Sequence, residues 1–274
     1  MLAIITVVYR NYEILHDFID SLSKQTSSFY KVYFVDVTET DKKVIIPWIR
    51  KIEGKYVFTE TQNMGYAHGV NAGIDQALKD GMTRFAVVNP DIVFDYEFVN
   101  HATQSISRHP KSIIGGKIFY AKGYEYHKDK YQDSQLGKVL WYAGGLIDWK
   151  HALGNHKGVD DVDAPKYNVL EKTDFVSGCL MIYDKSVYDI VGKWDKEYFM
   201  YFEDTDYCVR AAQKGISLWY DPNVVIYHKN AQSTGGSGSK MHELWMKRSR
   251  MRFGMKYAPL RTKIHLLINN ALSK

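Results

Sequence analysis

The order of predicted elements in the N-terminal third of this chain constrains its fold more than any other feature. Short β-rich apolar segments alternate there with segments whose apolar residues recur at helical spacing. Strands are predicted at residues 2–8, 32–35, 56–59 and 85–88, and helices between them at residues 12–25, 44–52 and 74–79. Strands that alternate with helices predict an α/β fold, with a mostly parallel central sheet flanked by helices.

The fourth predicted strand ends at Asn89-Pro90-Asp91. Proline has no N–H to donate, so the strand must end or bend there. An amide and a carboxylate then lie at the carboxyl edge of a central strand, where open α/β sheets bind ligands. A carboxylate in this place suits a hard divalent cation that also holds substrate phosphates. The alternative is an ordinary turn, because these residue types are common in turns.

Two further features suit a nucleotide. Asp36 follows the second strand and is placed to accept a hydrogen bond from a base or a ribose hydroxyl. The glycines at 65, 69 and 73 let the backbone approach a ligand closely, at the start of a helix whose N-terminus favours anions. Tight helix packing explains the same spacing equally well. Neither the dinucleotide fingerprint nor the P-loop is present, which disfavours a dehydrogenase or an NTPase.

Three acidic residues, Glu203, Asp204 and Asp206, open a predicted helix that continues through Arg210. The helix dipole stabilises carboxylates in a first turn, and this is the structural interpretation. The functional interpretation is a general base held at a helix start, with its pKa shifted by the aromatic residues before it. His228 follows the last of two short predicted strands, 217–220 and 224–227, and is a candidate second metal ligand.

Composition limits the setting of the protein. The two cysteines, Cys179 and Cys208, provide neither a disulfide framework nor a zinc site, which indicates a reducing compartment. No apolar run reaches membrane length, so we expect a cytoplasmic protein. The region 113–167 is rich in Gly, Tyr and Asp and is less periodic. Its aromatic and carboxylate side chains are typical of a sugar-binding surface.

The charge is concentrated in the tail, residues 240–274, which follows a Ser- and Gly-rich segment at 233–239. The tail carries nine Lys and Arg side chains against Glu243 alone, for a net charge of +8 in a chain whose total is +5. Apolar residues between the basic ones predict an amphipathic helix. Such a helix suits an anionic membrane surface, and packing on the rest of the protein is the alternative. No nucleic-acid-binding motif is present, so we expect no nucleic-acid partner.

Seven segments together resemble the family 2 glycosyltransferases, which have the nucleotide-sugar-binding GT-A fold. The resemblance runs in order from about Ile4 to Gly238. It is carried by Thr6–Asn11, Val35-Asp36, Asn63–Gly73, Asn89–Asp91, Phe175–Gly178, Tyr201–Arg210 and His228. It implies a catalytic domain at 1–239, with a nucleotide-binding half at 1–95 and an acceptor-binding half at 96–239, followed by a basic helical tail at 240–274.

The resemblance implies an inverting, metal-dependent transfer from a nucleoside diphosphate sugar. Asp91 matches the last acid of the family's Asp-x-Asp motif and His228 its late histidine, so these two would hold a divalent metal, Mn or Mg. Asn89 replaces the first acid, as in similar rhamnosyl- and galactofuranosyltransferases. Asp36 matches the acid that recognises the base, with Val37 where a second polar residue is usual. The implied donor-binding residues are Thr6, Val8, Tyr9, Asp36, Gly65, Tyr66, Asn71, Asn89 and Asp91.

Glu203 and Asp204 match the catalytic acidic pair, and we predict that Asp204 is the base. The implied acceptor-binding residues are Trp141, Ser177 and Gly178. The segments 143–148 and 175–178 resemble the rhamnosyltransferase branch. They favour L-rhamnose from dTDP-rhamnose and a saccharide or lipid-linked glycan acceptor in cell-surface polysaccharide synthesis, reached from the inner face of the membrane. A galactofuranosyl- or hexosyltransferase that uses a UDP-sugar and a non-catalytic binding module remain alternatives. A nucleotidyltransferase is disfavoured, because Thr6–Asn11 lacks its basic Gly-rich signature.

Overall fold

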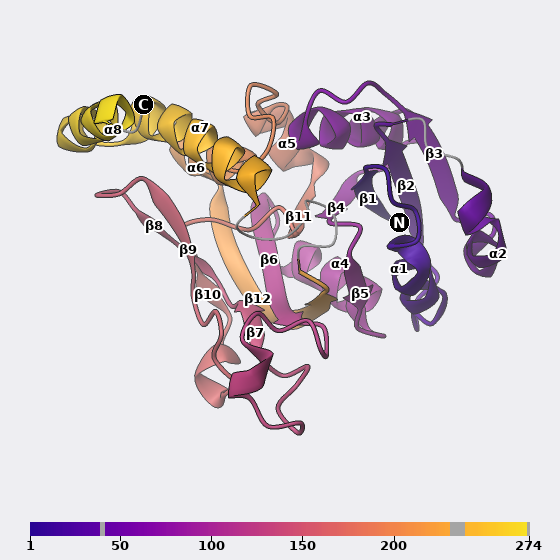
Figure 1. Cartoon of the computed structure of the whole chain (residues 1–274). Helices are drawn as coiled ribbons and strands as arrows, with labels where there is room; N and C mark the ends of the chain where they lie inside the picture. The colour runs from indigo at the N-terminus through magenta and orange to yellow at the C-terminus, as the bar shows by residue number, and fades with distance from the viewer. Residues whose placement is uncertain (39–41, 231–238, 273–274) are drawn as a thin grey trace.

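The computed structural model describes residues 1–38, 42–230 and 239–272 (Figure 1). Of the Ser- and Gly-rich segment 233–239, only Ser239 is among them. The first strands and helices form one side of the molecule, and the two C-terminal helices lie on the opposite side (Figure 1). Among the described residues, no helix combines the length and the apolar content needed to cross a bilayer.

The N-terminal half follows the predicted alternation. Its elements are β1 (Leu2–Val8), α1 (Leu15–Ser23), β2 (Tyr30–Asp36), α2 (Ile46–Ile49), β3 (Tyr56–Glu60), α3 (Tyr66–Lys79) and β4 (Arg84–Val88). β1 lies between β2 and β4, and all three neighbouring pairs from β4 to β3 are parallel. Two helices differ from their predictions. The predicted helix 44–52 is divided into 3-10 turns on either side of the short α2, which begins at Ile46 with Pro47 in its first turn.

The second difference is in α3, which begins at Tyr66 instead of residue 74. Gly69 and Gly73 lie inside the helix. Both positions require glycine, because a Cβ added there would lie 2.8 Å from Val7 and 2.5 Å from Ile5 of β1. The packing interpretation of this glycine spacing is therefore confirmed for these two positions. Only Gly65 precedes the helix.

The remaining elements complete the sheet. They are β5 (Ile92–Phe94), α4 (Phe98–Arg108), β6 (Ser112–Tyr120), β7 (Leu140–Tyr142), β8 (Gly145–Asp148), β9 (Leu153–His156), β10 (Glu171–Lys172), β11 (Leu180–Asp184), α5 (Lys185–Val191), α6 (Glu203–Gln213) and β12 (Ser217–His228). The sheet order is β10-β12-β6-β11-β4-β1-β2-β3, with β5 on β12 and β7 on β6, while β8 and β9 form a separate hairpin.

The sheet is mixed, because β11 runs antiparallel to both of its neighbours, β4 and β6. The parallel part predicted from the sequence is its β4-to-β3 half. The two short strands predicted at 217–220 and 224–227 form the single strand β12, with an irregularity between Asp221 and Val225. The structure also contains a central strand, β6, in the region predicted to be irregular. Gly116 belongs there because a Cβ would lie 2.1 Å from the carbonyl oxygen of Val224.

The tail forms two helices, α7 (Lys240–Tyr257) and α8 (Leu260–Leu272), separated at Pro259. Phe253 of α7 and Leu266 of α8 are buried in a small cluster with Ala152, Tyr198 and Phe202. The Arg250 guanidinium and the Thr262 hydroxyl donate to main-chain oxygens of the turn that joins β8 to β9. One face of the tail is therefore packed on the rest of the protein.

Candidate active site

Asp36 and Val8 lie opposite each other at the carboxyl ends of β2 and β1. Asp36 is buried, and its carboxylate accepts hydrogen bonds from the Tyr12 hydroxyl at 2.6 Å and from the Thr38 N–H at 2.9 Å. The side chains of Thr6 and Val8 are also buried, and the Val8 carbonyl accepts from the N–H of Val37. The structure therefore places these three residues at the predicted edge, and a role in donor binding stays a prediction for each.

Asp91 and His228 form a buried pair. Asp91 lies between β4 and β5, and His228 ends β12, whose pairing with β5 sets His228 against Ile92. The Asp91 Oδ1 and His228 Nε2 atoms are 3.2 Å apart. Both atoms fit one divalent cation, because ligand bonds of about 2.0–2.2 Å bring neighbouring donor atoms to such a separation. The described residues contain no group of three or more His, Cys, Asp or Glu side chains that could hold a metal.

Burial and neighbouring groups act in opposite directions on the pKa of His228. Burial lowers the pKa of His228, but the adjoining Cys179 sulfur and the Asp91 carboxylate raise it, and the net result is well above the usual histidine range. The Trp141 ring covers the imidazole edge-on at 4.7 Å. Trp141 also contacts His156, whose pKa is lowered to about 4 by burial. A cation bound here would replace the proton on Nε2.

The predicted catalytic pair begins α6. Asp204 is half-buried, and its Oδ2 atom accepts a hydrogen bond of 2.7 Å from the N–H of Gly178. Burial raises the pKa of Asp204, although the hydrogen bonds from Gly178 and Thr205 act in the opposite direction. Glu203 is buried, and its Oε2 atom has no hydrogen-bond partner in the described structure. Burial, reinforced by the charge of Asp204, raises the pKa of Glu203 well above its usual range.

The turn Ser177-Gly178-Cys179 contacts both the Asp91–His228 pair and Asp204. The Gly178 N–H binds Asp204, and the Gly178 carbonyl accepts from the Tyr66 hydroxyl at 3.1 Å. The Cys179 carbonyl accepts from the N–H of Asn89, and the Cys179 side chain adjoins His228. Ser177 is buried, and its hydroxyl oxygen accepts a hydrogen bond from the N–H of Cys179. No motif in the sequence pointed to Cys179, because its contacts depend on how β11 is placed.

Tyr66 lies near Glu203, Asp204 and Asp91. Burial raises its pKa well above the usual range, and the charges of Glu203, Asp204 and Asp91 add to this shift. Its N–H donates to the Phe199 carbonyl at 2.9 Å. Gly65, with φ +97°, makes this contact possible, because a Cβ there would lie 2.4 Å from the same oxygen.

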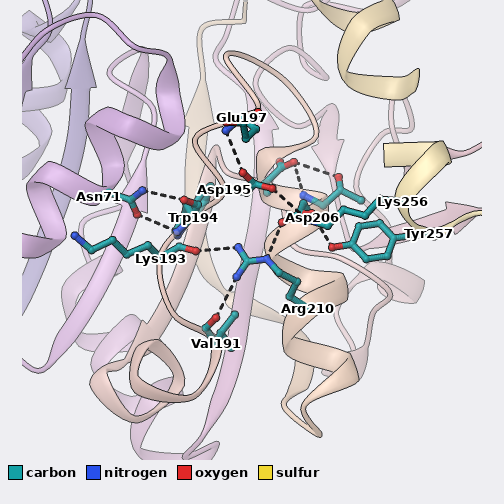
Figure 2. Close-up of polar contacts among 12 residues, drawn as sticks. Asn71, Val191, Lys193, Trp194, Asp195, Glu197, Asp206, Arg210, Lys256 and Tyr257 are labelled. Carbon is teal, nitrogen blue, oxygen red and sulfur yellow. Dashed lines mark hydrogen bonds and ion pairs between the residues drawn. The ribbon is translucent and has the colours of Figure 1, made fainter. Parts of the chain in front are cut away.

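Two other predicted donor-binding residues, Asn71 and Tyr9, have surroundings unlike those of the buried site residues described above. The Asn71 amide makes two hydrogen bonds of 2.9 Å, one to the carbonyl and one from the N–H of Trp194, so both its groups are used within the protein (Figure 2). Tyr9 is exposed, with the Arg10 guanidinium 5.0 Å from its ring centre. Donor contacts by Asn71 and Tyr9 stay predictions, and for Asn71 they would compete with these two bonds.

The chain enters α6 through a strained turn. Tyr201 and Phe202 have φ of 67° and 65°, in the left-handed region, where a residue other than glycine costs about 1–3 kcal/mol. The packing of α7 against this turn offsets the cost. Phe253 contacts the Phe202 ring at 5.3 Å, and the Ser249 hydroxyl donates to the carbonyl of Met200.

Residues 3–191 match the family described as Glycosyl transferase family 2. The chain belongs to glycosyl transferase family 2. The matched part contains Asp36, Gly178 and Asp91, whereas Glu203, Asp204 and His228 lie beyond it. The fold and the family together make this chain a glycosyltransferase.

Curated relatives of this glycosyltransferase agree at low identity. The low-salt glycan biosynthesis hexosyltransferase Agl10 of Haloferax volcanii is 23% identical over 220 residues, which cover 80% of this chain and 64% of the relative. The N-acetylglucosaminyl-diphospho-decaprenol L-rhamnosyltransferase of Mycobacterium tuberculosis is 26% identical over 248 residues, 86% of this chain and 78% of the relative. The chain thus spans somewhat less than two thirds of the first of these proteins.

Solved structures confirm the GT-A fold of this glycosyltransferase. GalNAc-T7 with UDP, GalNAc and Mn²⁺ superposes with a TM-score of 0.65 at 13% identity, over 91% of this chain and 47% of that one. The mannosyltransferase PcManGT of Pyrobaculum calidifontis, in complex with GDP-Man and Mn²⁺, superposes with a TM-score of 0.56 at 14% identity. The superposition covers 97% of this chain and 67% of that one. At these identities the likeness concerns the fold alone.

Proposed function

We propose that this glycosyltransferase moves a sugar with inversion from a nucleoside diphosphate donor to a hydroxyl of a saccharide or lipid-linked glycan. The best-supported donor is dTDP-L-rhamnose. The observation that carries the proposal is the 177–179 turn, which holds Asp204 through one residue and adjoins the Asp91–His228 pair through the next. A base and a cation on the same turn would together remove the acceptor proton and stabilise the leaving diphosphate in a single displacement at the anomeric carbon.

Asp204 acts as the general base in this proposal. Its free electron pair takes the proton of the acceptor hydroxyl, while the acceptor oxygen forms a bond to the anomeric carbon. The bond from that carbon to the diphosphate breaks on the opposite face, and the electron pair leaves with the diphosphate. A carboxyl pKa raised by burial makes Asp204 a stronger base than an exposed aspartate.

Asp91 and His228 would hold the divalent cation. When bound, such a cation stabilises the charge that develops on the leaving diphosphate. Two solved structures with this fold contain Mn²⁺ together with a nucleotide or nucleotide sugar, which favours Mn²⁺ here. The main-chain N–H of Asn89 donates to the Cys179 carbonyl. The side-chain amide of Asn89 carries no charge, so in this proposal it serves the donor as a hydrogen-bonding group.

A donor screen tests the proposed function directly. We expect dTDP-rhamnose with Mn²⁺ to raise the free energy of unfolding by about 2.7 kcal/mol at a hundredfold excess over Kd. Thermal shift measurements with dTDP-rhamnose, UDP-galactofuranose and UDP-glucose, with and without Mn²⁺, check this. A larger shift with a UDP-sugar would replace rhamnose by the galactofuranosyl or hexosyl alternative. No shift with any donor would contradict the proposal.

The outer face of α8 supports a lipid-linked acceptor. Leu260, Ile264, Leu267 and Ile268 are each at least half exposed, whereas Leu266, on the opposite face, is buried. Arg261 and Lys263 flank this apolar stripe, and Glu243 is the only acidic residue of the tail. We propose that the stripe contacts an anionic membrane surface on its cytoplasmic side, where each basic residue contributes roughly 1 kcal/mol.

Substitution within the stripe tests this contact without removing the packed face of the tail. We expect the triple variant Leu260→Ser, Ile264→Ser, Leu267→Ser to lose at least ten-fold in affinity for vesicles that contain phosphatidylglycerol, measured by co-sedimentation. Phe29→Ser with Val169→Ser is the matched control, because both residues are exposed apolar positions outside the tail. Equal binding by the triple variant and the wild type would exclude the membrane contact.

A further inference from the structure

The first turn of α6 is held on two sides. On one side, Asp204 accepts from Gly178, and on the other, Asp206 is bound to α7. We propose that Asp206, Lys256 and Tyr257 are positioning residues of the active site, which hold the first turn of α6, and with it Asp204, against α7. The proposal rests on the proposed role of Asp204 as the base.

Asp206 is the centre of the contact (Figure 2). Its carboxylate is fully buried and accepts from three groups. The Oδ2 atom accepts from Arg210 Nε at 2.7 Å, and the Oδ1 atom accepts from Lys256 Nζ and from the Tyr257 hydroxyl, both at 2.7 Å. Two of the three donors thus come from α7. Removing a partner from a buried carboxylate lowers the stability of a protein far more than removing one from an exposed carboxylate. The contact therefore fixes the position of α6 relative to α7.

The network extends beyond α6. The Arg210 guanidinium donates to the carbonyls of Val191 and Lys193, and Lys256 also lies 3.2 Å from Asp195 (Figure 2). The Asn71 amide binds the Trp194 backbone between these positions. The loop before α6 is therefore tied to α3 at one end and to α7 at the other.

A second set of contacts follows the chain towards Asp204. The Trp245 ring of α7 stacks on Phe199 at 4.4 Å, and the Phe199 carbonyl accepts the N–H of Tyr66. The Ser249 hydroxyl binds the carbonyl of Met200, next to the left-handed residues Tyr201 and Phe202. α7 therefore contacts every part of the turn that leads into the catalytic pair, and its displacement would move Asp204 relative to Gly178.

Positioning and mere stabilisation predict different kinetics. An interaction that only stabilises the fold changes the amount of folded enzyme. An interaction that orients Asp204 changes kcat of the folded enzyme while KM for the donor is kept, because small misplacement of a catalytic group costs rate.

The test uses a double variant that carries both Lys256→Met and Tyr257→Phe. It is compared with the single variant Arg250→Met. Arg250 is the matched control, because its hydrogen bonds join α7 to the His151 carbonyl of the β8–β9 turn instead of to α6. At a temperature where each variant is folded, we expect the double variant to lose at least ten-fold in kcat with dTDP-rhamnose and Mn²⁺, with KM for the donor changed less than three-fold. Lys256→Arg, which keeps the charge, should retain most of the rate that Lys256→Met loses. An unchanged kcat in the double variant would overturn the proposal.

Hydrogen exchange separates this proposal from the choice of donor. The amides of residues 204–206 should exchange at least ten-fold faster in the double variant than in wild type, and at the wild-type rate in Arg250→Met. If wild type turns over no donor, the proposed function fails, and this measurement still decides the positioning. Equal acceleration in the double variant and the control would refute a specific role for Asp206 and its partners.

Discussion

Replacing Asp204 with Asn is expected to lower kcat by about 100-fold to 10,000-fold, the range that general base catalysis contributes. The amide keeps the shape of the side chain and an oxygen that accepts from the Gly178 N–H, so the α6 turn should be preserved. It has no electron pair basic enough to take the acceptor proton. Initial rates of nucleotide release with dTDP-rhamnose measure the loss, and thermal shift with the same donor should show binding retained.

Asp184→Asn is the matched control for this substitution. Asp184 caps α5, and its carboxylate likewise accepts main-chain N–H groups, from Ser186 and Val187. Asn caps helices as well as Asp does, so this variant should keep the stability and the activity of wild type. Turnover by Asp204→Asn equal to wild type would remove Asp204 as the base. It would direct attention to Glu203 or, if neither residue matters, to a module that binds nucleotide sugars without catalysis.

Replacing Asp91 with Asn is expected to abolish the effect of Mn²⁺ on donor binding and to lower kcat/KM at least 100-fold. The substitution removes the only carboxylate of the Asp91–His228 pair, and a neutral amide is a much weaker ligand for a hard cation. It also removes the Asp91 charge, one of the two neighbours that raise the pKa of the buried imidazole, so the proton on His228 is less favoured. Titration of UDP and dTDP with and without Mn²⁺, followed by isothermal calorimetry, measures the change.

Asp95→Asn is the control for the metal prediction. Asp95 lies just beyond β5 and accepts the N–H of Glu97, away from His228. We expect its Mn²⁺ response to equal that of wild type. The converse variant, Asn89→Asp, restores the acid that the family usually has and should increase the affinity for Mn²⁺. Donor binding by Asp91→Asn that still responds to Mn²⁺ as in wild type would place the cation elsewhere.

Local patterns were sufficient for much of the fold. The apolar segments β1, β2, β3 and β4 were recognised because each is short, β-rich and bounded by turn residues. The central strand β6 was missed for the opposite reason. It contains Gly115 and Gly116, which weaken a strand pattern, and they are required by close neighbours from other parts of the chain. No local rule contains that information.

The residues of the candidate site were found from motifs, but their partners were not. Asp91 and His228 were predicted as a pair, and the structure brings them together. That Gly178 would bind Asp204 through its N–H, and that Asp206 would bind Lys256, depends on how distant segments pack. The Asn71 prediction shows the reverse difficulty. A polar residue within a motif can serve a backbone contact, and residue type alone does not distinguish the two uses.

The pairing of β12 with β5 has a consequence for the order in which the protein folds. His228 is next to Asp91 only because Ile92 and His228 are partners in that ladder, although they are far apart in the sequence. Closing so long a loop is entropically costly and slow, so such contacts form late. During synthesis the strands β1 to β4 can pair as soon as they emerge, whereas Asp91 and His228 cannot meet until β12 has been made. The enzyme would therefore gain its chemistry last, as a final step of folding.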